Sequence, residues 1–211
     1  MATLEDAIRV YRYNRSTRLL TGLNTVLYAY KRHGMEFKPK VMEAIVFGEH
    51  QDRLKHHKFI DFKKLKKATA SKLKNFYPLP DFKSFEELFG QVETEIHETI
   101  YGIGRLTTYD IALRIGFLYD EPLLPKEHVY IQAGALKGIK ALSADPAYSS
   151  LLPECVWKVG AYPIADFKAA FGDLESMYIE DFLCVFHNEL TSLAAYSVKD
   201  LQTKLLTYTN I

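Results

Sequence analysis

Residues 100–112 read Ile-Tyr-Gly-Ile-Gly-Arg-Leu-Thr-Thr-Tyr-Asp-Ile-Ala, and this stretch decides the fold. Two glycines in it, Gly102 and Gly104, stand between segments whose apolar residues recur at helical spacing. Glycine adopts backbone conformations that a Cβ atom would strain, and we expect both glycines in such conformations. The pattern predicts two helices joined by a tight turn, a helix-hairpin-helix element over residues 100–115.

Helical spacing of apolar residues extends over most of the remaining chain. Ser84 with Glu87 three residues later is typical of a helix start, and Pro39 suits the first turn of another helix. We predict a mainly α fold, a multi-helix domain with the helix-hairpin-helix element at its centre. Besides the helix after the hairpin, the expected helices cover residues 4–33 with a break near 14–17, 39–47, 50–75, 84–100, 127–142, 146–152, 163–171, 175–192 and 197–207.

One internal boundary is visible at Tyr77-Pro78-Leu79-Pro80-Asp81, where two prolines interrupt the chain. This segment is too short to establish two domains, so we expect residues 1–211 to form a single domain. The alternative is a subdivision into a basic helical part, residues 1–77, and a part that contains the hairpin, residues 78–211.

The charge of the chain is unevenly distributed, although its net value is only +1. Residues 1–75 have 17 Lys and Arg against 7 Asp and Glu, whereas residues 76–211 have 10 against 19. The first part is therefore +10 and the second −9. A basic part can bind phosphates or an acidic partner, and it can equally pair with the acidic part of its own chain or of a second copy.

Residues 50–75 are the most basic stretch of the sequence. Apolar residues are interleaved with the lysines at roughly helical intervals, so we expect an amphipathic basic helix there. If the partner is a nucleic acid, the lysines expected to contact its phosphates are Lys63, Lys64, Lys66 and Lys67.

The stretch 100–112 resembles the helix-hairpin-helix motif of DNA-repair proteins. That motif has an apolar residue, Gly-apolar-Gly, two variable residues, Thr or Lys, a small residue and then an apolar helix. Its glycine turn presents backbone N–H groups at the start of the second helix, and these groups, with the helix dipole, form a phosphate-sized anion site. The resemblance implies contacts to the nucleic-acid backbone, without readout of sequence, from Gly102, Gly104, Arg105, Thr107 and Thr108.

Residues 85–142 extend the resemblance to the helix-hairpin-helix DNA glycosylases. In those enzymes the hairpin is followed by a Val-Asp-Thr-His-Val-like segment that supplies the catalytic aspartate. Here residues 125–129 read Pro-Lys-Glu-His-Val, so Lys126 stands at the aspartate position. Leu106 stands where bifunctional members have a nucleophilic lysine. The resemblance therefore implies a glycosylase-like helical core without the active site of that family.

The sequence predicts no metal or cofactor site. No pair of the seven histidines has the i,i+4 spacing with an accompanying acid, and Cys155 and Cys184 have no CxxC partner. Phosphate-loop, nucleophile-elbow and dinucleotide motifs are missing. The apolar setting of both cysteines favours reduced thiols, and the N-terminus has no hydrophobic run typical of a signal peptide, so we expect a cytoplasmic protein. No stretch reaches the roughly 18 apolar residues of a membrane helix, so no membrane partner is expected.

Three functions follow as hypotheses. The first is a protein that binds DNA or another nucleic acid and does no chemistry on it. The second is a divergent base-excision glycosylase in which Glu127 or Asp110 replaces the lost aspartate, although the sequence favours the absence of enzymatic activity. The third is an interaction module that forms a homo-oligomer through its oppositely charged halves. Residues 109–116 and 128–135 also resemble segments of uncharacterised bacterial proteins, which imply no function.

Overall fold

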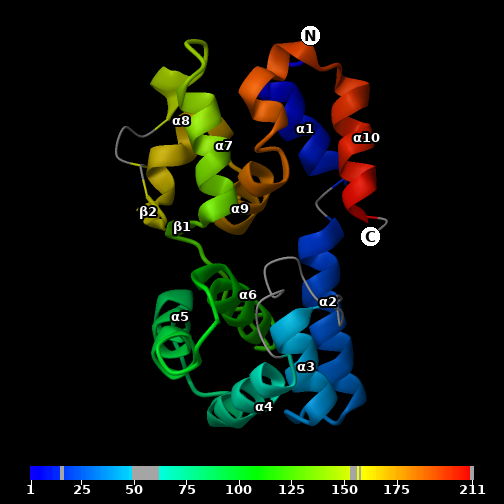
Figure 1. The fold of residues 1–211 in the computed structure, drawn as a ribbon, viewed down its shortest axis with the longest axis vertical. Helices are drawn as coiled ribbons and strands as arrows, with labels where there is room; N and C mark the ends of the chain where they lie inside the picture. The colour runs from blue at the N-terminus through cyan, green and yellow to red at the C-terminus, as the bar shows by residue number, and fades with distance from the viewer. Residues whose placement is uncertain (15–16, 49–61, 153–155, 157, 210–211) are drawn as a thin grey trace. The chain divides into compact units, whose positions relative to one another are not determined.

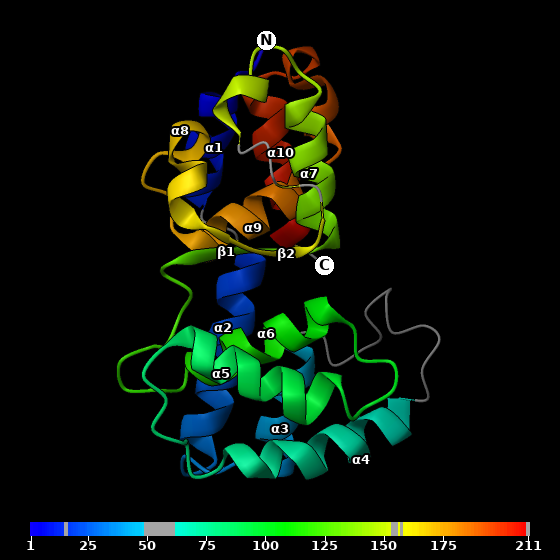
Figure 2. The same ribbon diagram turned by 90° about the vertical axis from the view of Figure 1, so that its left-hand side faces the viewer.

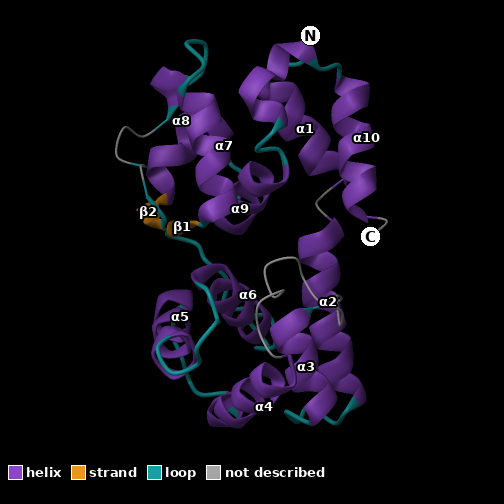
Figure 3. Ribbon diagram, in the orientation of Figure 1, coloured by secondary structure: helices purple, strands orange, loops and turns teal. Residues whose placement is uncertain are grey.

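The structure is a computed structural model that describes residues 1–14, 17–48, 62–152, 156 and 158–209 (Figure 1). Helices make up most of it, and the described strands form one two-stranded sheet (Figure 3). The prediction of a mainly α fold is therefore confirmed. None of the helices within these ranges is long and apolar enough to cross a membrane.

The chain divides into two compact units. Unit 1 consists of Met1–Leu20 and Pro125–Ile211, and unit 2 is the intervening segment Thr21–Leu124. The proline-rich segment 77–81 lies inside unit 2, just after the 3-10 turn Lys74–Phe76. The division thus falls at positions other than the Tyr77-Pro78 step, and unit 1 is built from both ends of the chain.

Unit 2 surrounds one central helix, α6 (Arg105–Gly116) (Figure 2). This helix contacts α5, α3 and the π-helical turn Glu93–His97, so it is buried on nearly every side. Residues 98–104 form the loop between that turn and α6. The other helices of the unit are α2 (Thr17–Arg32), which begins in unit 1, α3 (Pro39–Phe47), α4 (Phe62–Leu73) and α5 (Phe85–Val92).

Local sequence explains where two of these helices begin. Pro39 is the first residue of α3, where its missing N–H is not needed for a helical bond. The hydroxyl of Ser84 accepts a hydrogen bond from the N–H of Glu87 at 3.2 Å, and the Glu87 carboxylate accepts one from the N–H of Lys83 at 2.8 Å. These contacts cap α5, as the Ser84–Glu87 spacing predicts.

Unit 1 combines the two-stranded sheet with helices from both ends of the chain. Helix α7 packs closely on α9. A Cβ atom on Gly134 would lie 2.4 Å from the Sγ atom of Cys184, and one on Gly138 would lie 2.4 Å from the carbonyl oxygen of Leu183. Glycine at these two positions therefore permits the close approach of the two helices. The elements of the unit are α1 (Leu4–Asn14), β1 (His128–Ile131), α7 (Ala133–Ser143), the 3-10 turn Ser149–Leu151, β2 (Gly160–Pro163), the 3-10 turn Ile164–Phe167, α8 (Lys168–Phe171), α9 (Ser176–Val185), the 3-10 stretch Glu189–Ala195 and α10 (Val198–Thr209).

The largest departure from the expected helices is at residues 127–142. Helix α7 begins only at Ala133, because residues 128–131 form strand β1 and pair antiparallel with residues 160–163 of β2. In this pairing Val129 lies opposite Tyr162. The β-branched and aromatic side chains of His-Val-Tyr-Ile suit a strand once such a partner is present.

Some of the other expected helices match, but residues 146–152 contain only the 3-10 turn Ser149–Leu151, and the helix expected over residues 175–192 ends as α9 at Val185. The break near 14–17 falls between α1 and α2, and α3 has the expected bounds. Of the basic helix expected over residues 50–75, the part from Phe62 is α4, and residues 49–61 lie outside the described residues.

Candidate functional site

The loop of residues 98–104 is anchored at two points and exposed between them. Ile100 and Ile103 are buried, whereas Tyr101 and Gly102 between them are exposed. The N–H of Ile103 donates to the carbonyl oxygen of Ile100 at 3.3 Å, which closes a turn. Gly102 has a φ of +93°, a region that L side chains rarely adopt. The turn therefore needs glycine at this position.

His97 ties the base of the loop to the preceding π-helical turn. Its Nδ1 atom lies 2.9 Å from the carbonyl oxygen of Ile103. Since a carbonyl oxygen can only accept, Nδ1 carries the proton and donates it. This bond and the burial of Ile103 fix the loop from both sides.

Gly104 is the N-cap residue of α6 and has an extended backbone, with φ −87° and ψ 166°. A Cβ atom here would meet nothing within 4 Å, so the outer face of the loop is open at this position. The expectation of strain at both glycines is therefore right for Gly102 and wrong for Gly104. The lack of a side chain at Gly104 leaves the outer face of the loop uncovered, whereas its backbone conformation does not require glycine.

The start of α6 has no side-chain cap. The first N–H groups of any helix lack intrahelical acceptors, and Gly104, the N-cap residue of α6, has no side chain that could accept from them, unlike Ser84 of α5. Arg105 is exposed and has no hydrogen-bond or ion-pair partner among the residues that the structure describes. Helix α6 thus begins without a cap from its own N-cap residue, and the next residue in sequence carries a solvent-exposed guanidinium.

Thr107 and Thr108 are not on this surface. Both side chains are buried, and the Thr108 N–H and hydroxyl both donate to the Gly104 carbonyl oxygen, at 3.0 and 3.1 Å. Contacts from these two side chains to an external phosphate are therefore a wrong prediction. The reason is geometric, because residues three and four positions after the cap turn toward the helices that enclose α6.

Two acidic residues near the loop have cationic partners inside unit 2. A carboxylate oxygen of Glu95 lies 3.6 Å from Nζ of Lys72, on α4, and accepts from the side-chain amide of Asn75 at 3.1 Å. The carboxylate of Asp110 lies 3.4 Å from a guanidinium nitrogen of Arg114. Part of the negative charge around the loop is therefore compensated within the unit.

Arg114 serves the fold rather than the loop surface. Its Nη1 atom donates to the carbonyl oxygens of Ile45 at 3.0 Å and Val46 at 2.9 Å, in the last turn of α3. A cation at this end of a helix is favoured by the helix dipole. Because the Arg114 guanidinium is bound to α3, Arg105 is the arginine of α6 that remains exposed beside the loop.

The basic helix α4 is described only in part. The side chains of Lys63, Lys64 and Lys66 lie outside the described residues, and Lys67 is exposed. In Figure 2 the start of α4 lies on the same side of unit 2 as the loop before α6. The expected lysine cluster therefore begins on the side of the unit where the uncapped end of α6 is found.

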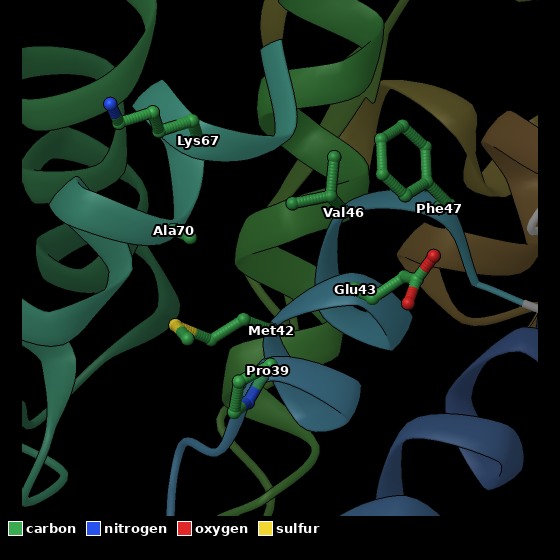
Figure 4. A pocket seen from close by; sticks show the side chains of 7 residues that line it. All are labelled: Pro39, Met42, Glu43, Val46, Phe47, Lys67 and Ala70. Atoms are coloured by element: carbon green, nitrogen blue, oxygen red, sulfur yellow. The ribbon is translucent and has the colours of Figure 1, made fainter. Parts of the chain in front are cut away.

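Lys67 also stands at the rim of a pocket of about 330 Å³ between α3 and α4 (Figure 4). The pocket is mostly apolar, and Glu43 is its other charged residue. Its remaining lining residues are Pro39, Met42, Val46, Phe47 and Ala70.

The two carboxylates considered for catalysis lie in different units. Asp110 is on α6 in unit 2 and is held by Arg114, as above. Glu127 is in unit 1, is exposed, and follows the exposed Lys126 just before β1. Its backbone carbonyl oxygen accepts a hydrogen bond from the N–H of Ile164 at 2.8 Å. Neither environment marks its carboxylate as a catalytic acid or base.

Within the described ranges, no group of three or more His, Cys, Asp and Glu side chains is placed to hold a metal ion. No protein-family model, curated protein sequence or solved structure matches the chain.

Proposed function

We propose that unit 2 binds the backbone of a nucleic acid, DNA above all, at the loop of residues 98–104 and the start of α6. The observation that carries this proposal is the uncapped N-terminus of α6, which follows a glycine turn with an open outer face. A phosphate there would accept from backbone N–H groups at the start of the helix and would be favoured by the helix dipole. This use of the loop agrees with its resemblance to the helix-hairpin-helix motif.

Positive charge supports the same site. The Arg105 side chain is exposed one residue after the cap, and a guanidinium can donate two parallel hydrogen bonds to a phosphate. Lys67 and the other lysines at the start of α4 would extend the contact along the backbone. The pairing of Glu95 with Lys72 and of Asp110 with Arg114 lowers the repulsion that these acids would exert on a phosphate.

The proposal is binding without base excision. Lys126 and Leu106 stand at the two positions where the glycosylase resemblance requires an aspartate and a lysine. The paired state of Asp110 and the exposed position of Glu127 give no support to a replacement carboxylate.

The test is the affinity of the whole chain for labelled single-stranded and duplex DNA, measured by fluorescence anisotropy over a salt series. Affinity should fall steeply with salt, by a slope of about −0.9 in log affinity against log salt for each phosphate neutralised on a duplex. Arg105→Ala should weaken binding and make this slope shallower by about one phosphate.

Lys168→Ala is the matched control, because Lys168 is an exposed cation on α8 in unit 1. It should leave both affinity and slope nearly unchanged. Absence of binding at low salt, or equal losses in the two variants, would overturn the proposal. Concentration-dependent sedimentation in the absence of DNA would instead support the interaction-module hypothesis.

A further inference from the structure

The tip of the loop before α6 presents one aromatic side chain to solvent. The relative exposure of Tyr101 is 101%, that of a fully extended residue in water, although its neighbours Ile100 and Ile103 are buried. Two other tyrosines of unit 2 are also exposed, but each has a ring contact. The Arg32 guanidinium lies 6.0 Å from the ring centroid of Tyr28, and the Phe37 ring lies 5.7 Å from that of Tyr77. Tyr101 has no such contact with the described residues.

The loop fixes the backbone from which the Tyr101 ring projects. The Ile103–Ile100 hydrogen bond closes the turn around Tyr101 and Gly102, and the positive φ of Gly102 reverses the chain. His97 then holds the far side of the turn through the Ile103 carbonyl oxygen. A ring held on a fixed stem loses less conformational freedom on binding than one on a flexible tail.

We infer that the Tyr101 ring stacks on an unpaired base, so that the site takes single-stranded or locally unpaired nucleic acid in preference to intact duplex. This inference rests on the proposed function. Tyr101 lies three residues before Gly104, the N-cap residue of α6, so the exposed ring and the proposed phosphate site belong to the same short loop.

The physical reason for the preference is the accessibility of the base faces. In a duplex each base is covered above and below by its neighbours, whereas an unpaired base offers a free face to an aromatic side chain. Such stacking tolerates any base, because every base has a π-face. The ring would therefore add affinity for unpaired strands without adding sequence preference.

The experiment compares three probes of one sequence: a labelled single strand, its duplex, and the same single strand with abasic sites in place of its nucleotide bases. Tyr101→Ala should weaken binding of the single strand by roughly 5- to 150-fold, the range expected for one stacked base. It should change the affinities for the duplex and for the abasic strand by less than about twofold, because neither offers a free base face. Tyr101→Phe should bind like the wild type, since stacking needs the ring and not the hydroxyl.

Tyr28→Ala is the matched control, an exposed tyrosine of the same unit on α2, and it should leave all three affinities unchanged. The inference is overturned if Tyr101→Ala binds the single strand as the wild type does, or if it weakens all three probes equally. It is also overturned if the variant changes only the oligomeric state in sedimentation, because the ring then belongs to a contact between copies. These results leave the proposed function standing, whereas a wild-type chain that binds none of the probes at low salt overturns both.

Discussion

The guanidinium of Arg114 lies 3.1 Å from the point at which Gly48 would carry a Cβ atom. Gly48 ends α3 with a φ of +61° and a ψ of −137°, and the space beside it is occupied by the guanidinium that caps the last carbonyl groups of α3. The glycine therefore has two roles, since it permits the backbone conformation and makes room for the cap. Through this contact α6 holds α3 in unit 2.

Gly48→Ala should destabilise the protein by about 1–2 kcal/mol from backbone strain, and by more where the new Cβ displaces the guanidinium. Urea denaturation followed by circular dichroism measures the change. In an Arg114→Ala background the same substitution should be less damaging, because only the backbone strain remains, and a double-mutant cycle gives the difference.

Gly90→Ala is the control for the Gly48 substitution, because Gly90 lies in α5 and no atom lies within 4 Å of the place that its Cβ would take. There the change should raise stability by about 0.5–1 kcal/mol, since alanine is the better helix former. A Gly48→Ala protein as stable as the wild type would contradict both roles assigned to Gly48.

Gly102→Ala and Gly104→Ala should separate stability from binding. Gly102 has a positive φ, so its substitution should destabilise the loop by about 1–2 kcal/mol and weaken DNA binding with it. A Cβ on Gly104 meets no protein atom, so Gly104→Ala should unfold at nearly the wild-type urea concentration. It should still weaken binding, because the methyl group would stand on the open face where the phosphate is proposed. Unchanged DNA affinity in a stable Gly104→Ala protein would exclude a phosphate at this face.

If the proposed function is right, changing Lys63, Lys64, Lys66 and Lys67 together to Glu should weaken DNA binding strongly. The expected physical effect is electrostatic, so the loss should be largest at low salt and the salt slope should become shallower by about 0.9 for each lost phosphate contact. Gel-shift titration at several salt concentrations measures both. An equal salt slope in wild type and variant would remove these lysines from the interface.

Tyr119 offers a pH test of the packing around the loop of residues 77–81. Burial raises the pKa of Tyr119 to about 12, with further contributions from the charges of Asp81 and Tyr30, and its hydroxyl donates to the Pro80 carbonyl oxygen at 2.7 Å. Because the folded state favours the protonated phenol, its contribution to stability is complete below the unfolded pKa of about 10 and is lost as the pH rises toward 12.

Tyr119→Phe should therefore be less stable than the wild type near neutral pH, by about 0.5–1.5 kcal/mol for the lost hydrogen bond. The gap in urea stability between the two proteins should narrow between about pH 10 and pH 12. A gap that is constant over this range would show that Tyr119 ionises as it does in water.

Sequence reasoning succeeds where the information is local. Pro39 at the start of α3 and the Ser84–Glu87 pair before α5 act within a few residues of themselves, and so does the positive φ of Gly102. Strand β1 is not predicted from the sequence, because its partner strand lies about thirty residues further along the chain. Without that partner, the short His-Val-Tyr-Ile segment is equally compatible with a helix.

The candidate site shows the same limit. The spacing of the motif locates Gly104 and Arg105 correctly on an exposed loop end, but it cannot tell that Thr107 and Thr108 face the core. That depends on which elements enclose α6, and these come from two separate stretches of sequence, residues 39–47 and 85–97. The role of Arg114 at α3 is hidden for the same reason, since its acceptors Ile45 and Val46 lie almost seventy residues earlier.

The last prediction concerns chemistry on DNA, and we expect none. Cleavage of a glycosidic bond develops positive charge on the sugar, which a carboxylate stabilises and a lysine at the same place opposes. Lys126 holds that position in the glycosylase resemblance, and Leu106 cannot form the Schiff base that lyase activity requires. Residues 126 and 127 precede β1 and are not part of a helix. Duplexes with uracil, oxidised or alkylated bases should therefore show no base release and no borohydride-trapped adduct. Turnover that disappears in Glu127→Gln would make the protein an enzyme and contradict this prediction, whereas turnover that survives in Glu127→Gln but not in Asp110→Asn would place the carboxylate on α6.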